Sequence, residues 1–115
     1  MFLANLQPVF VGPEVVASVD VGVQCVYQQL AMEGFDVIDA HTCSCCGDQT
    51  WIFSNNEFEG LINALEHVRP DIIDFLNDCC FIEVNESRCV TTIIVPVDAV
   101  ASFTELMTVF LYLIS

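Results

Sequence analysis

The chain contains no lysine, and Arg69 and Arg88 are its only arginines. Sixteen carboxylate side chains outweigh these two cations, so the formal net charge at pH 7 is -14. Such a charge repels nucleic acid and anionic membranes, and it leaves few groups to bind a phosphorylated or carboxylate substrate. We therefore expect no direct binding to nucleic acid and no membrane partner. We expect the partner to be the basic surface of another protein; the alternative is that the acidity serves solubility alone.

The sequence also lacks the common catalytic motifs. It has no glycine-rich phosphate loop, no HExxH pair and no calcium-binding EF-hand loop. Cys43 with His41 or His67 would offer a nucleophile and a base, but no recognised motif surrounds these residues. We therefore expect the protein not to be an enzyme.

No run of about 18 uninterrupted apolar residues occurs, because Asp98 and Glu105 interrupt the apolar C-terminal segment. The start of the chain lacks the positively charged region of a signal peptide, and Pro8, Gly12 and Pro13 break its apolar stretch. Seven cysteines, an odd number, fit a reducing compartment better than a disulfide framework. We expect a cytoplasmic protein without a transmembrane helix.

Apolar residues are abundant, at 55% of the 115 residues, and the mean hydropathy is +0.63. Soluble domains contain about 45–50% apolar residues, so this chain has enough apolar surface to fold rather than remain disordered. Domains of about 100–150 residues are the most common size. We therefore expect one folded domain over residues 1–115, with a core that needs no disulfide bonds.

The periodicity of the apolar residues predicts an alternation of strands and helices. The expected elements are an edge strand at 6–12, a helix at 13–34, strands at 35–43 and 49–53, helices at 54–68 and 69–80, strands at 80–84 and 89–97, and a helix at 98–115. Ser54 and Glu57 have the spacing of a capping box, and Asp98 is the expected N-cap of the last helix. The order predicts an α+β fold, in which a mostly antiparallel sheet of two hairpins packs against three to four helices.

Three cysteines crowd the expected turn of the first hairpin, in the sequence CSCCG at 43–47. Cys43 and Cys46 form a C-x-x-C-G element that resembles half of a zinc knuckle or ribbon, in which two thiolates bind the ion and the glycine permits a tight turn. A structural zinc site has four ligands, so we expect Cys80 and Cys89 to complete it, or His41 in place of one of them. The alternative is that the cysteines are small buried side chains, with Cys25 and Cys79 the best examples.

Carboxylates recur at helical spacing on the two middle helices. Asp71, Asp74 and Asp78 lie three and four residues apart, and Glu59 and Glu66 lie seven apart. Side chains at these spacings share one helix face, and a row of carboxylates at this pitch can imitate the phosphates of nucleic acid. The alternative is an ordinary solvated face, although such a face would usually interleave basic residues with the acidic ones.

In its size, charge and compactness the chain resembles the small acidic phage-encoded inhibitors of nucleases and CRISPR complexes. That resemblance implies a non-enzymatic inhibitor that blocks the basic groove of a nucleic-acid-binding protein with the five carboxylates above. A small adaptor domain with a structural zinc at the C-x-x-C-G knuckle is the alternative function. Binding through carboxylates would weaken with salt, whereas an adaptor would lose its fold with its metal.

The last expected helix is apolar on two sides. One stripe consists of Phe103, Met107, Phe110 and Ile114, and a second consists of Leu106, Val109 and Leu113. A helix of this kind is either deep in a core or packed against a partner. Because a 115-residue domain can hardly surround a helix, we expect a homodimer with the first stripe at its interface.

Overall fold

The computed structural model describes residues 21–115; the edge strand expected at 6–12 and the first part of the helix expected at 13–34 lie outside the described residues. The elements are α2 (Val21–Met32), β1 (Val37–Thr42), β2 (Gln49–Ser54), α3 (Asn55–Val68), α4 (Pro70–Cys79), β3 (Phe81–Asn85), β4 (Val90–Val95), the 3-10 helix η1 (Val97–Ala99) and α5 (Val100–Ile114). The strands form one four-stranded sheet in which every pair is antiparallel. The expected α+β fold with two hairpins is therefore confirmed.

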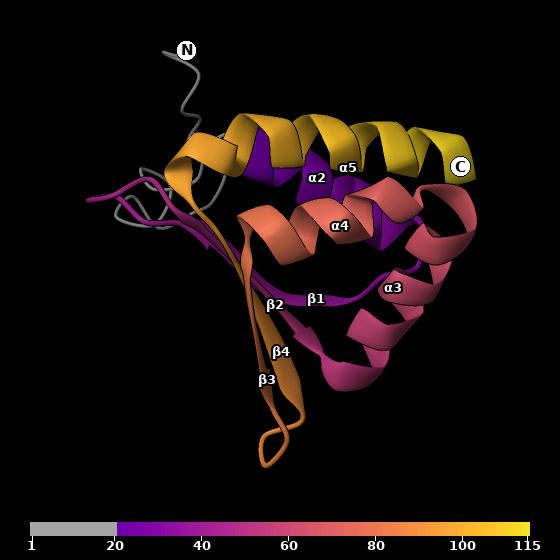
Figure 1. The fold of residues 1–115 in the computed structure, drawn as a ribbon, viewed down its shortest axis with the longest axis horizontal. Helices are drawn as coiled ribbons and strands as arrows, with labels where there is room; N and C mark the ends of the chain where they lie inside the picture. The colour runs from indigo at the N-terminus through magenta and orange to yellow at the C-terminus, as the bar shows by residue number, and fades with distance from the viewer. Residues whose placement is uncertain (1–20) are drawn as a thin grey trace.

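The two hairpins are joined through their second strands. β2 pairs with β4, which gives the strand order β1-β2-β4-β3. In this central pair Gln49 lies opposite Val95, and Ser54 lies opposite Val90. The β1–β2 turn and the β3–β4 turn therefore lie at opposite ends of the sheet, which can be followed in Figure 1.

The core lies between the sheet and the helices, with α2, α4 and α5 on the same side of the sheet (Figure 1). The inward side chains alternate along the central strands, as strand geometry requires; they are Trp51, Phe53, Ile93 and Val95. The Trp51 ring packs at a tilt against Phe103 of α5, with ring centroids 5.7 Å apart. Its Nε1 donates a buried hydrogen bond to Gln49 Oε1 at 3.1 Å, so the indole is both packed and satisfied. From α2, the expected apolar stripe is confirmed in the described residues Val23, Val26 and Leu30.

Helix α3 begins where the sequence predicts. The Ser54 side chain accepts a hydrogen bond from the Glu57 amide at 3.1 Å, which confirms Ser54 as the N-cap. The Glu57 carboxylate accepts instead from the backbone amide of Asp36, at 2.9 Å. Glu57 thus ties the start of α3 to the approach to β1, 21 residues earlier in the chain.

The start of α5 differs from the prediction, and Asp98 is not its N-cap. The chain first makes the 3-10 turn η1, in which the Ala99 amide donates to the Pro96 carbonyl at 2.8 Å. Asp98 lies inside this turn, and Ala99 precedes α5 without a capping side-chain bond. The tight turn after Pro96 therefore displaces the helix start by two residues, to Val100.

The predicted dimer interface on α5 needs correction. Phe103, Met107 and Phe110 are at most 3% exposed and pack into the core of their own chain. Ile114 is partly buried against the same core. The face of α5 that meets solvent instead carries Val109, Tyr112 and Leu113, which are 40%, 77% and 53% exposed. The stripe assigned to a partner is therefore the one that the sheet and α2 cover.

Within the described residues, the stretch Val97–Ile114 is long and apolar enough to cross a membrane, by length and composition only. A core helix of a soluble protein meets the same criteria. About 28% of this stretch is buried inside the domain, including Phe103 and Phe110. The absence of a membrane partner stays a prediction from the net charge.

Candidate metal centre

The cysteine turn, residues 43–48, connects β1 to β2 and has a backbone closed by its own hydrogen bonds. The Cys43 amide donates to the Asp48 carbonyl at 2.8 Å, and the Gly47 amide donates to the Cys43 carbonyl at 2.9 Å. Gly47 has a φ of 84°, the left-handed region that glycine adopts without steric cost. A Cβ at this position would also lie 2.7 Å from Val97 Cγ2. The turn therefore requires glycine here for its backbone angle and for its contact with η1.

A second link between the turn and η1 comes from Asp48. Its Oδ1 accepts a hydrogen bond from the Val97 amide at 2.9 Å. Val97 follows β4, whose last residue Val95 pairs with Gln49 at the start of β2. The sheet register thus brings the two segments together, and Asp48 holds them there.

The turn gathers three thiols at the surface. The sulfur atoms of Cys43, Cys45 and Cys46 all lie within 4.8 Å of one another, and those of Cys43 and Cys45 are 3.0 Å apart. Thiolates that share a zinc ion with bonds of about 2.3 Å lie roughly 3.8 Å apart, so small side-chain rotations would bring these sulfurs to bonding positions. This cluster could hold a metal ion, and it is the one such group found among residues 21–115.

The three thiols have very different acidities. Hydrogen bonds from Cys45 and Cys46 stabilise a thiolate at Cys43 and lower its pKa from 9.0 to about 6. The hydrogen bond with Cys43 and the charge of its thiolate raise the pKa of Cys45. At Cys46 the Asp48 backbone lowers the pKa, but the bond to Cys43, desolvation and the nearby negative charges raise it to about 11. At neutral pH the cluster therefore carries one negative charge, held at Cys43 by two thiol donors.

The other ligands that the sequence suggests do not join this cluster. Cys89 follows the β3–β4 turn, where its carbonyl accepts from the Asn55 amide, so it lies at the opposite end of the sheet. Cys80 precedes β3, two strands away from β2, and is 8% exposed; burial raises its pKa to about 11. His41 is exposed, and its Nδ1 lies 3.2 Å from an Asp39 carboxylate oxygen. The β2–β4 register thus separates Cys89 from the cluster, and the strand order separates Cys80.

Cys45 is the member of the cluster that the predicted ligand set leaves out, because the C-x-x-C spacing selects Cys43 and Cys46. The signal was present in the sequence, since three cysteines in four residues of one turn cannot lie far apart. The alternative of buried thiols holds for Cys80 alone; Cys25 and Cys79 are both exposed.

All five carboxylates of the predicted acidic face are exposed: Glu59, Glu66, Asp71, Asp74 and Asp78. They lie on α3 and α4, as expected. Arg69, between the two helices, donates from Nε and Nη2 to the two Asp71 carboxylate oxygens, at 2.8 and 2.7 Å. These bonds lower the pKa of Asp71. The sequence predicts no counter-charge on this face, and Arg69 corrects that prediction at one of the five positions.

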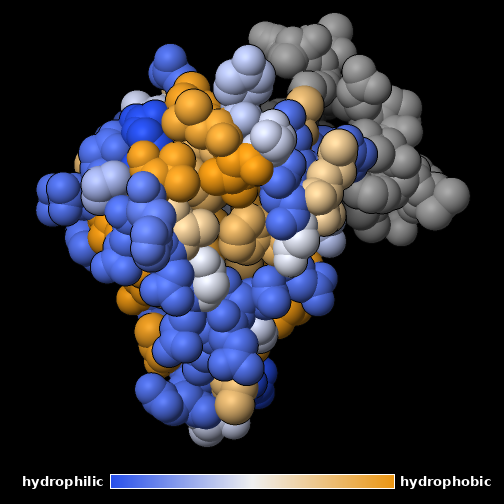
Figure 2. Space-filling model, turned by 90° about the vertical axis from the view of Figure 1, so that its right-hand side faces the viewer, coloured by the Kyte–Doolittle hydropathy of each residue, from blue (hydrophilic) through white to orange (hydrophobic). Residues whose placement is uncertain are grey.

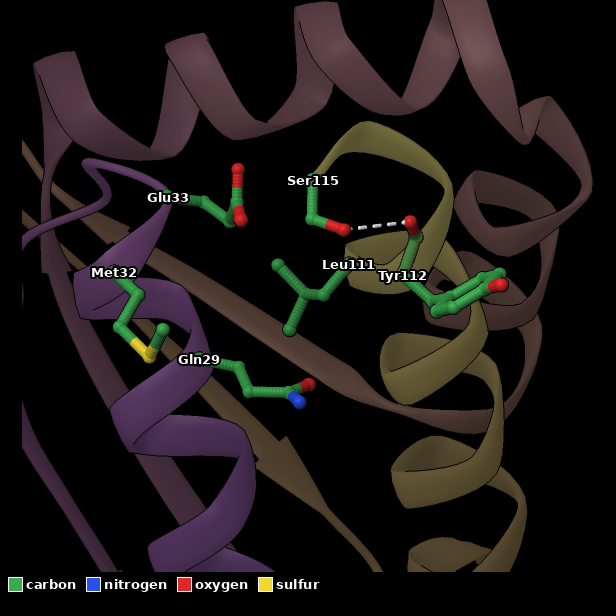
Figure 3. A pocket seen from close by; sticks show the side chains of 6 residues that line it. All are labelled: Gln29, Met32, Glu33, Leu111, Tyr112 and Ser115. Carbon is green, nitrogen blue, oxygen red and sulfur yellow. Dashed lines mark hydrogen bonds between the residues drawn. The ribbon is translucent and has the colours of Figure 1, made fainter.

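A pocket between the ends of α2 and α5 is lined by Gln29, Met32, Glu33, Leu111, Tyr112 and Ser115 (Figure 3). Its volume of about 190 Å³ is below the ~300–1,000 Å³ of most small-molecule sites. The one hydrogen bond drawn in it, from Ser115 Oγ to the Tyr112 carbonyl at 2.9 Å, belongs to the end of the helix. Figure 2 faces the side on which α5 ends and shows apolar surface there, bordered by hydrophilic residues. Exposed apolar side chains are common on soluble proteins, so we assign no chemistry to this area.

No family model, no curated protein and no solved structure matches the chain. The fold and the site therefore define its class by themselves: a small, acidic α+β protein with a three-cysteine cluster at one end of its sheet.

Proposed function

We propose that this protein is a non-enzymatic binding protein that holds one thiophilic metal ion in the cysteine turn. The observation that carries the proposal is the convergence of three sulfur atoms within 4.8 Å of one another. Thiolates are the protein ligands preferred by soft ions such as zinc and monovalent copper. The acidic surface supports the proposal, because a net charge of -14 raises the local concentration of cations.

The ion is proposed as bound cargo or a bound cofactor rather than as the element that holds the fold together. The turn is closed by backbone hydrogen bonds at Cys43 and Gly47, which need no metal. Cys45 and Cys46 are exposed, whereas the core of the domain lies between the sheet and the helices. A bound cargo ion differs from the structural zinc of the adaptor suggested by the sequence, because such an adaptor would not fold without its metal.

Cadmium is a suitable first probe, because thiolate-to-cadmium charge transfer can be followed in the ultraviolet. The reduced, metal-free protein should bind one equivalent of cadmium with this absorption, and should unfold cooperatively with or without it. Cys45→Ser should remove most of the signal. Cys79→Ser, which changes an exposed cysteine outside the turn, is the matched control and should bind like the unaltered protein.

The proposal would be overturned by the absence of stoichiometric cadmium binding, or by binding that persists unchanged in Cys45→Ser. A Cys80→Ser, Cys89→Ser double variant separates this site from the one suggested by the sequence. It should retain binding, because the β2–β4 register places Cys89 at the opposite end of the sheet and the strand order places Cys80 two strands away from β2.

A second candidate function is binding to a basic protein surface through α3 and α4, as in an inhibitor that imitates nucleic acid. Its support is the exposure of the five carboxylates together with the absence of lysine. Asp74 and Asp78 are better placed than Asp71, whose charge is already paired with Arg69. Binding would be electrostatic, so its affinity should fall steeply as the ionic strength rises above about 0.1 M, where the Debye length is about 10 Å.

The test uses a partner captured from cells by the full chain and then purified. Asp74→Asn with Asp78→Asn should weaken binding and flatten its salt dependence. Asp39→Asn with Glu105→Gln, on β1 and α5, removes the same charge elsewhere and serves as the charge-matched control. Binding that ignores salt, or that the double variant leaves intact, would remove this candidate.

A further inference from the structure

The number of ligands in the cysteine turn limits the ion that it suits. Among the described residues the cluster contains three sulfur atoms and no fourth histidine, cysteine or carboxylate ligand. His41 and Asp48 are the nearest candidates in sequence, but neither places a ligand atom within 4.8 Å of all three sulfurs. The turn therefore offers three thiolates and no fourth side chain.

Zinc and monovalent copper respond differently to such a set. A structural zinc ion has four protein ligands in tetrahedral geometry, so three thiolates leave it with an open position that water must fill. Monovalent copper is a softer, singly charged ion that thiolates select, and it accepts three sulfur ligands in a plane without a fourth ligand. Resting on the metal-binding function proposed above, we infer that the cysteine turn is a three-coordinate site for monovalent copper.

The distances support a planar arrangement after small adjustments. Three sulfurs around one ion, with bonds of roughly 2.3 Å, would form a triangle with edges of about 4 Å. All three pairs in the turn are within 4.8 Å, and the 3.0 Å pair of Cys43 and Cys45 must open by about 1 Å. Cys45 is exposed, so a rotation of its side chain meets no packed core. The backbone can stay as it is, because its hydrogen bonds at Cys43 and Gly47 do not involve the sulfurs.

Binding is a ligand substitution and involves no change of oxidation state. Copper enters as a monovalent complex, the three sulfurs form bonds to it, and the thiols among them release their protons to the solvent. The former ligand of copper leaves with its electron pair. Divalent copper is excluded from the experiment, because it would oxidise the thiols.

The experiment loads the reduced full-length protein with monovalent copper under anaerobic conditions, against a colorimetric chelator of monovalent copper. One equivalent should move to the protein, and excess zinc should not displace it. X-ray absorption of the loaded protein should show three sulfur neighbours around copper. Loss of a group that only supports a metal ligand weakens metal affinity by ~10–100-fold, and loss of a ligand should cost at least as much. Three single variants should therefore each lose the copper to the chelator: Cys43→Ser, Cys45→Ser and Cys46→Ser.

Cys79→Ser is again the control, and circular dichroism of each variant checks that the domain remains folded. Displacement of copper by excess zinc, or a spectrum with two or four sulfur neighbours, would overturn this inference and leave the metal-binding function standing. A protein that binds neither cadmium nor monovalent copper would overturn both.

Discussion

Asp48 accepts a hydrogen bond from the Val97 amide, 49 residues further along the chain, with an oxygen–nitrogen distance of 2.9 Å. This bond joins the cysteine turn to η1, at the corner where β4 leads into α5. The same two segments touch where Gly47 approaches the Val97 side chain. The candidate metal site is therefore attached to α5, which carries Phe103, Met107 and Phe110 of the core, through one short corner.

Loss of this bond should loosen the turn more than it destabilises the domain. In Asp48→Ala the Val97 amide loses its acceptor but can bond to water, so the free energy of unfolding should fall by about 1 kcal/mol. Cadmium affinity should fall as well, because the three sulfurs lose part of their preorganisation. Urea denaturation and cadmium titration of the same samples measure the two effects. Asp98→Ala, in η1 but without a side-chain role in capping α5, is the control; equal losses in both variants would contradict the tether.

Gly47 should be intolerant of any side chain. Gly47→Ala places an L-residue at a φ of 84° and a Cβ 2.7 Å from Val97 Cγ2. The left-handed backbone alone costs about 1–2 kcal/mol, and the contact adds to it. Gly60→Ala offers the opposite case, because it lies in α3 with no atom within 4 Å of the added Cβ. That variant should gain about 0.5–1 kcal/mol from helix propensity. Thermal and urea unfolding of both variants would test this; a neutral Gly47→Ala would contradict the described turn.

The thiols of the turn should react at different pH values. Cys43 has a pKa of about 6, so it is largely ionised at pH 7, whereas Cys46 with a pKa of about 11 is not. Because the thiolate is the nucleophile, iodoacetamide at pH 7 should modify Cys43 first. Its rate should rise from pH 5 and level off above about pH 7, and mass spectrometry of the labelled peptides would show this. In Cys45→Ala, which removes the strongest of these hydrogen-bond donors, the rise should shift to higher pH. Preferential labelling of Cys46 would contradict the arrangement.

Metal affinity should rise with pH for the same reason. At neutral pH the Cys43 sulfur is already a thiolate, while the raised pKa values of Cys45 and Cys46 keep these two protonated. An ion bound by all three must displace about two protons, so its apparent affinity increases as the pH rises above 7. Calorimetric metal titration in two buffers of different ionisation enthalpy measures the number of protons released on binding. Affinity independent of pH would show that Cys45 and Cys46 are not ligands.

The two sides of α5 should respond differently to truncation. Phe103 is 3% exposed and packs against Trp51, so Phe103→Ala should destabilise the domain by about 3–5 kcal/mol. Leu113 is 53% exposed, and Leu113→Ala should change stability by less than about 0.5 kcal/mol. Denaturant unfolding of both variants would test this. If the protein is a dimer, sedimentation of Leu113→Ala, rather than of Phe103→Ala, reports on the interface.

The sequence by itself determined the type and order of the described elements and the start of α3, but not the start of α5. Alternation along 49–53 predicts a central strand, Ser54 predicts the start of α3, and helical spacing places the five carboxylates on exposed faces, because each depends on neighbours a few residues away. It also placed thiols in the β1–β2 turn. Which cysteines form the site was decided by the register of β2 against β4, a contact between distant segments that sends Cys89 to the far end of the sheet. The same applies to the partner of Glu57, to the burial of Phe103 and to the anchor of the turn at Val97. These depend on tertiary packing, since an apolar stripe has the same pattern whether its own chain or another covers it.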